Sequence, residues 1–257
     1  MRLYFRELGQ GQPLIILHGL FGSSDNWLTI SKEFAKYFHV FIVDQRNHGQ
    51  SPHMAPHNYD ALAADLAEFM EQQNIVNPYI IGHSMGGKTV MKFLTSHLAD
   101  VKKAVVVDIS PRYYPQHHQA YIAAMTGLDL ASLQSRQEVE NAFIAHGVTN
   151  IAERQFLMKN LYRDDNGAFH WKINLELLVK EIENIGEGTP ATAQSSVPTL
   201  FIKGSKSDYY IKSEDTELIS QIFPNSKIIT IENSGHWVQA EQPQAFFDEV
   251  MKFFSLP

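Results

Sequence analysis

The chain has 257 residues, of which 44% are hydrophobic and 19% are charged, so it can form a buried core and global disorder is excluded. Its net charge of -7 argues against a surface that binds nucleic acid or anionic lipid. It contains no cysteine, which excludes disulfides, cysteine-based zinc sites and a thiol nucleophile.

The beginning of the chain, residues 1–10, carries charges and lacks the apolar stretch of a secretory signal peptide. No apolar run is long enough to cross a bilayer. We therefore expect a cytoplasmic protein without a membrane partner. The sequence does not indicate an oligomeric state.

Short apolar runs alternate along the chain with longer amphipathic stretches. The runs are rich in β-branched or aromatic residues and are bounded by Gly, Pro, Asp or Asn, which is typical of parallel strands buried on both faces. The expected strands are residues 14–17, 40–43, 79–81, 104–107, 199–202 and 228–231. The expected helices are residues 24–38, 59–74, 85–98, 213–223 and 242–254. This alternation predicts a mostly parallel, doubly wound α/β sheet.

One connection is far longer than a normal crossover between strands. Between residues 111 and 197 the sequence offers no convincing buried strand, and roughly ninety residues exceed what such a connection needs. Helices are expected instead around residues 116–125, 135–146, 151–161 and 174–185. We therefore expect a helical cap at 111–195, inserted into a core made of 1–110 and 196–257. The low-complexity segment 186–196 is the expected return linker.

Residues 82–86 read Gly-His-Ser-Met-Gly and lie between an expected strand and an expected helix. The pattern G-x-S-x-G is weak alone, but the strand–turn–helix setting is what a nucleophile elbow requires. Glycines at positions 82 and 86 let strand and helix pass closely, and the Ser84 hydroxyl is expected to project above the sheet. The Met85 amide, at a helix N-terminus, can stabilise an oxyanion. The competing interpretation is a glycine-rich turn in which Ser84 only caps the helix.

The segment HGLFG at residues 18–22 follows the first expected buried strand. Enzymes with a nucleophile elbow take the second amide of the oxyanion hole from such a loop. Leu20, directly after His-Gly, is the expected donor, and Phe21 is the next candidate. The alternative is a glycine turn without a catalytic role. We expect His18 to support the loop.

His236 lies in the segment SGHW, after the last expected strand and before the last expected helix. An imidazole with an ordinary pKa near 6.5 can take the proton of a serine hydroxyl and later return it to the leaving group. Its place in the chain also fits the order Ser…Asp…His. We therefore predict that His236 is the general base.

Other polar residues are assigned structural roles or none. In the loop DQRNHGQS, we expect Asp44 and Arg46 to bond nearby backbone or each other. His117 and His118 are adjacent and are expected to point to opposite sides of a helix, so they do not indicate a metal. The chain has neither a P-loop nor a G-x-G-x-x-G motif, so no cofactor or metal is expected.

Two aspartates compete for the role of the acid that orients His236. Asp108 ends the apolar strand 104–107, where an unpaired carboxylate is costly to bury, so it needs a specific partner. Its alternative role is to cap the turn at 108–111. Asp208 follows a later strand, in the polar run KGSKSD. The residues alone leave this choice open.

The segments HGLFGSSDNW, DQRNHGQS, GHSMGGK, VDISP and GHW occur in this order, and in them the chain resembles the α/β-hydrolase superfamily and, more narrowly, the YbfF-like esterases. The resemblance spans residues 14–110 and 198–254. It implies a cofactor-free carboxylesterase or acyl thioesterase with Ser84 as nucleophile, His236 as base and Asp108 as acid. Many members carry the acid in a G-x-x-D after a later strand. Here Ser207 occupies that slot, and Asp208 follows it.

The predicted reaction is acyl transfer from a small-molecule ester or thioester to water. Ser84 attacks the carbonyl, and His236 accepts its proton. The Leu20 and Met85 amides bind the oxyanion of the tetrahedral intermediate, which then collapses to an acyl-enzyme. The cap supplies aromatic candidates for an acyl pocket, namely Tyr113, Tyr114, Phe143, Phe156 and Trp171. Two rivals stay open: carbon–carbon hydrolysis or perhydrolysis with the same triad, and a ligand-binding receptor with a vestigial triad.

Overall fold

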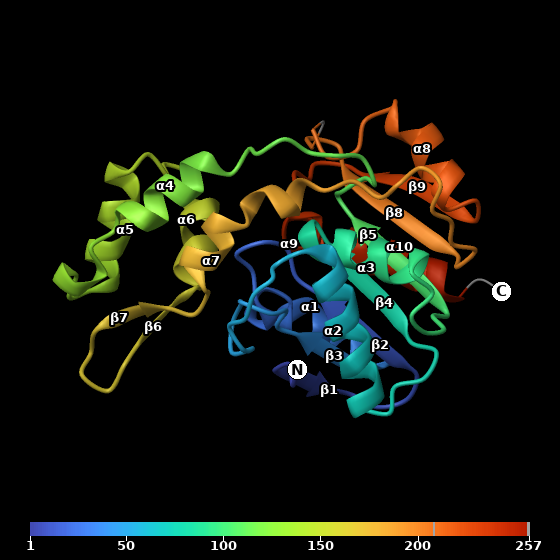
Figure 1. Cartoon of the computed structure of the whole chain (residues 1–257), viewed down its shortest axis with the longest axis horizontal. Coiled ribbons are helices and arrows are strands. Elements are labelled where there is room, and N and C mark those ends of the chain that lie inside the picture. Colours follow the sequence, from blue (N-terminus) through green and yellow to red (C-terminus); the bar gives the residue numbers. More distant parts are fainter. Residues whose placement is uncertain (208, 256–257) are drawn as a thin grey trace.

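The computed structural model describes residues 1–207 and 209–255, and it is built around a seven-stranded sheet (Figure 1). The strand order is β1-β3-β2-β4-β5-β8-β9, and β1 alone runs antiparallel to its neighbour. The strands are β1 (Phe5–Leu8), β2 (Pro13–Leu17), β3 (His39–Val43), β4 (Tyr79–His83), β5 (Lys103–Val107), β8 (Thr199–Gly204) and β9 (Ser226–Ile231). The predicted mostly parallel sheet is confirmed.

Helices cover both faces of this sheet, as a doubly wound fold requires. One face packs against α2 (Tyr59–Gln72), α3 (Met85–Thr95) and α8 (Asp215–Ile222), and the other against α1 (Leu28–Phe34) and α10 (Pro243–Ser255). The central strands β4 and β5 are buried at every position, which explains their unbroken apolar runs.

In the first part of the chain, the structure differs from the prediction at one helix and one strand. The expected helix 24–38 is a 3-10 turn, Ser24–Asn26, followed by the shorter α1. Strand β1 was not predicted, because an edge strand of partly exposed residues has no continuous apolar run.

The long connection between β5 and β8 forms a group of helices beside the sheet (Figure 1). Its helices are α4 (Gln119–Gly127), α5 (Arg136–Ala145), α6 (Ile151–Met158) and α7 (Leu175–Lys180), with 3-10 turns at Leu130–Ser132 and Ile182–Gly186. A hairpin of β6 (Leu161–Arg163) and β7 (Phe169–Trp171) joins α6 to α7. The expected helix 151–161 is therefore wrong at its end. We keep the division into a cap at 111–195 and a core as a proposal.

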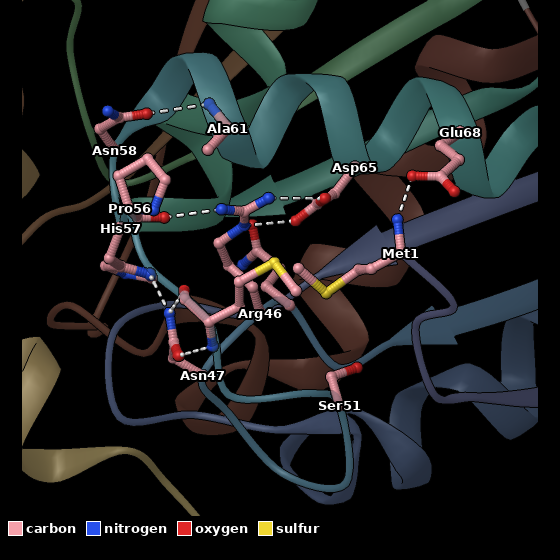
Figure 2. Close-up of polar contacts among 12 residues, drawn as sticks. Met1, Arg46, Asn47, Ser51, Pro56, His57, Asn58, Ala61, Asp65 and Glu68 are labelled. Carbon is pink, nitrogen blue, oxygen red and sulfur yellow. Dashed lines mark hydrogen bonds and ion pairs between the residues drawn. The ribbon is translucent and has the colours of Figure 1, made fainter.

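Arg46 ties the loop after β3 to helix α2 (Figure 2). Its guanidinium donates to both carboxylate oxygens of Asp65, at 2.5 and 2.7 Å, and to the carbonyl of Pro56 at 2.6 Å. The carboxylate of Asp44 accepts from the amides of Ser24 and Gln50. The expected bonding to nearby backbone is therefore confirmed for both residues, but the ion partner of Arg46 is Asp65.

Replacing Asp65 by asparagine is expected to lower the free energy of unfolding by about 3 kcal/mol, because it leaves the Arg46 guanidinium buried without its counter-charge. Both side chains are less than a tenth exposed. Urea denaturation measures the change. The control is Asp60→Asn on the same helix, whose exposed pair with Lys92 is worth less than about 1 kcal/mol. Equal stability of the two variants would contradict this account.

Candidate active site

Ser84 occupies the sharp turn between β4 and α3. Its backbone has φ 52° and ψ -117°, a region that a non-glycine residue enters only when its surroundings hold it there. A Cβ on Gly82 would lie 2.3 Å from the carbonyl oxygen of Gly86, and one on Gly86 would lie 2.5 Å from that of Leu17. The glycines therefore permit the close approach of strand and helix that places Ser84 at the carboxyl end of the central strand β4.

Asp108 and His236 are hydrogen-bonded to each other. Asp108 follows β5 at φ 51° and is fully buried, and its Oδ2 accepts from His236 Nδ1 at 2.8 Å. The Gly204 amide donates to Oδ1 at 3.1 Å, and the Ser207 hydroxyl donates to Oδ2. None of these partners belongs to the turn at 108–111. Asp208, the alternative acid, lies outside the described residues.

Burial controls the protonation of this pair. It raises the pKa of Asp108 to about 7, against the opposing hydrogen bonds from Ser207 and Gly204. Burial also lowers the pKa of His236 below its ordinary value. Because the Nδ1 proton points at a carboxylate, which only accepts, Nε2 of the neutral ring carries the free lone pair. That nitrogen has the character of a base.

Two side chains that the sequence did not single out position His236. His83 donates from Nε2 to the carbonyl oxygen of His236 at 2.8 Å. The Tyr210 ring stacks on the imidazole, with centroids 3.8 Å apart and planes at 17°. His83 is the variable residue inside G-x-S-x-G, and no local pattern marks Tyr210. Both hold the ring in one orientation.

The loop after β2 lies against Ser84. A Cβ on Gly19 would be 3.2 Å from the Cβ of Ser84. The Phe21 amide donates to His48 Nε2 at 3.2 Å, whereas the amides of Leu20 and Met85 have no hydrogen-bond partner among the described residues. Of the two amides expected from this loop, the one of Leu20 is thus free to bind an oxyanion.

The ring of His18 holds this loop in place through two hydrogen bonds. Its Nε2 accepts from the amide of Gln45 at 3.0 Å, and its Nδ1 donates to the carbonyl of Gly19 at 2.8 Å. Burial lowers the pKa of His18 to about 4, so the ring is neutral. These contacts give it the supporting role expected from the sequence.

Two cavities meet at Ser84. Both are partly open to solvent. The larger is lined by Leu20, His236 and Trp237 among others. The smaller is narrow and is lined by Met85 and Tyr114. Ser84 belongs to both. A substrate bound across Ser84 can therefore extend in two directions.

Only two of the five expected cap aromatics line these cavities. Phe156 lines the larger cavity and Tyr114 the smaller. Phe143 is fully buried in the cap, Trp171 lines a separate hollow with His53, and the other, Tyr113, is 56% exposed. Their positions in the expected helices did not indicate which of these aromatic side chains is buried in the cap, which is exposed and which lines a cavity.

His117 and His118 also lie beside Ser84, in the smaller cavity. Both precede the first residue of α4, and their rings face each other with centroids 3.9 Å apart. The expectation that they point to opposite sides of a helix is therefore wrong, because the helix begins after them. His117 Nε2 lies 3.1 Å from the Tyr210 hydroxyl.

Lys88, one turn along α3 from Ser84, holds the two segments that enter and leave the cap. Its ammonium donates to the carbonyls of Arg112 at 2.5 Å and Glu187 at 2.7 Å. Burial lowers its pKa to about 7. Lys88 of GHSMGGK thus fixes both ends of the cap segment by hydrogen bonds, a structural role that its sequence context does not indicate.

Comparison with known proteins gives concordant matches. Residues 12–243 match the family model described as the alpha/beta hydrolase fold. The chain is 35% identical to mouse sn-1-specific diacylglycerol lipase ABHD11 over 94% of this chain and 80% of that protein. It is 33% identical to esterase YbfF of Escherichia coli (strain K12) over 95% of this chain and 93% of that protein.

A solved structure, titled marine microorganism esterase, superposes with a TM-score of 0.94 at 43% identity, covering 98% of each chain. The resemblance to YbfF-like esterases and the predicted fold are both confirmed. Among helices of the described residues, none is long and apolar enough to cross a membrane.

Proposed function

The chain belongs to the α/β-hydrolase family and is an enzyme of the esterase type, and from that premise we propose that it hydrolyses carboxylic esters or acyl thioesters through an acyl-enzyme on Ser84. The observation that carries this proposal is the hydrogen bond of 2.8 Å between His236 and the buried Asp108, beside the cavity that Ser84 and His236 both line.

In the proposed mechanism, the Ser84 oxygen attacks the acyl carbonyl while His236 Nε2 takes the hydroxyl proton. Asp108 stabilises the imidazolium, and the amides of Leu20 and Met85 donate to the oxyanion. Collapse of the tetrahedral intermediate breaks the bond to the alcohol or thiol, which receives the proton from His236. Water then attacks the acyl-enzyme by the same steps and releases the acid.

The two cavities receive different parts of the substrate. The leaving group must reach His236 for its proton, so it lies in the larger cavity, which His236 lines. The acyl group then points toward the smaller cavity beside Met85 and Tyr114. The walls of that smaller cavity include Ile109, Ile182 and Ile185, which suit an apolar chain.

Turnover of p-nitrophenyl esters and matched acyl thioesters, graded by acyl length, tests the proposal with purified protein. We expect ester hydrolysis with a burst of p-nitrophenol equal to the enzyme present, as an acyl-enzyme requires. Saturable binding without turnover would indicate a receptor. Turnover only with peroxide, or only of a carbon–carbon substrate, would indicate one of the same-fold rivals.

The activity is expected to fall at acid pH. The working form needs an Asp108 carboxylate and a neutral His236, so one proton taken up by the pair removes activity. Since the pKa of Asp108 is raised to about 7, kcat/KM for a slow ester should rise with pH and level off above about that value. A flat profile from about pH 5 to about pH 8 would contradict the assignment.

A further inference from the structure

The larger cavity beside Ser84 contains a carboxylate that the proposed mechanism does not use. Glu153, in the first turn of α6, lines this cavity together with His236. Among the described residues that line it, no other is acidic and none is lysine or arginine. Burial lowers the pKa values of its histidines, His83, His118 and His236, to about 3, so they are neutral near pH 7. Glu153 is therefore the one acidic side chain among the described residues that line the cavity, in addition to the Asp108 carboxylate buried behind His236.

No cation of the protein neutralises Glu153 among the ion pairs of the described residues. The neighbouring Arg154 turns away and pairs with Glu140 at 3.2 Å, while also donating to the carbonyls of Val148 and Thr149. The Asn150 side chain accepts from the Glu153 amide at 3.3 Å and fixes the start of the helix. The carboxylate is thus held at the cavity without a cationic partner among the described residues.

Aromatic side chains line the same cavity as this carboxylate. The rings of Phe156 and Trp237 lie 5.5 Å apart, and both line the cavity with Tyr121 and Tyr210. Burial, followed by the charge of Glu153 and a side-chain hydrogen bond to it, raises the pKa of Tyr121. Aromatic faces attract cations, and a carboxylate beside them adds a counter-charge. This combination suits a substituted ammonium group.

We propose that Glu153 is a specificity residue that selects esters whose alcohol part carries a positive charge. The inference rests on the proposed function, because the proton transfer from His236 is what places the alcohol in this cavity. The protein's net charge of -7 acts in the same direction by attracting cations.

Two esters with the same acyl group test this inference: a choline ester and the 3,3-dimethylbutyl ester, in which carbon replaces the quaternary nitrogen. The measured quantity is the ratio of their kcat/KM values, choline ester over neutral ester. In wild type we expect a ratio above one. In Glu153→Gln we expect the ratio to fall about tenfold, as expected for one charge pair at a partly exposed site.

The matched control is Glu176→Gln, which removes the same charge from an exposed position in α7 of the cap and should leave the ratio unchanged. An unchanged ratio in Glu153→Gln, including an equal loss with both esters, would overturn the inference. So would a wild-type preference for the neutral ester. If wild type hydrolysed neither ester nor any p-nitrophenyl ester, the proposed function would fail, and the inference with it.

Discussion

Ser84→Ala is expected to lower kcat for ester hydrolysis by about 10⁴–10⁶. The alanine Cβ occupies the same place as that of serine at φ 52°, so the turn is expected to fold. What is lost is the oxygen that attacks the carbonyl and carries the acyl group. The remaining rate reflects the oxyanion amides and substrate binding alone. The measurement is steady-state hydrolysis of a p-nitrophenyl ester, with folding checked by circular dichroism.

A suitable control for this variant is Ser96→Ala, which removes an exposed hydroxyl at the end of the same helix and should keep full activity. The burst of p-nitrophenol should also vanish in Ser84→Ala, because no acyl-enzyme forms. Turnover of a folded Ser84→Ala within about tenfold of wild type would remove the basis of the mechanism.

Asp108→Asn is expected to lower kcat by about 10³–10⁴, less than the loss of Ser84. Asparagine cannot hold the imidazolium by charge, and its amide group can donate to Nδ1, which selects the wrong tautomer of His236. The same change removes the acceptor for the Gly204 amide or the Ser207 hydroxyl. The variant is measured with the same ester, and its folding is checked in the same way.

The comparison that decides this assignment is Asp208→Asn, which we expect to stay within a few fold of wild type. Ser207→Ala is a third variant for this comparison. It removes one hydrogen bond to the Asp108 carboxylate and should lower kcat less than Ser84→Ala or Asp108→Asn does. If Asp208→Asn were the crippled variant and Asp108→Asn remained active, Asp108 would not be the acid.

Much of the fold could be predicted because local patterns specify it. The buried strands β4 and β5 read as continuous apolar runs, and G-x-S-x-G between strand and helix specifies the turn at Ser84. Strand β1 escaped prediction because its partner β3 lies far along the chain and supplies the pairing that its own residues do not signal. The three-residue strands β6 and β7 are too short to show a period.

The surroundings of the site could not be read from the sequence, because they depend on contacts between distant segments. Asp108 was distinguished from Asp208 by family resemblance, whereas its partners Gly204 and Ser207 come from another strand and loop. Tyr210 stacks on His236 from a loop without any motif. Glu153 lies in an ordinary amphipathic helix and gains its interest only from the cavity that it lines.

The central claim is that Ser84 is the nucleophile, and covalent labelling tests it most directly. Wild-type protein is treated with a fluorophosphonate, digested, and analysed by tandem mass spectrometry while residual ester hydrolysis is followed. We expect one adduct, on Ser84, formed in proportion to the loss of activity. Loss of activity with the adduct on another serine, or full modification of Ser84 with ester turnover intact, would contradict it.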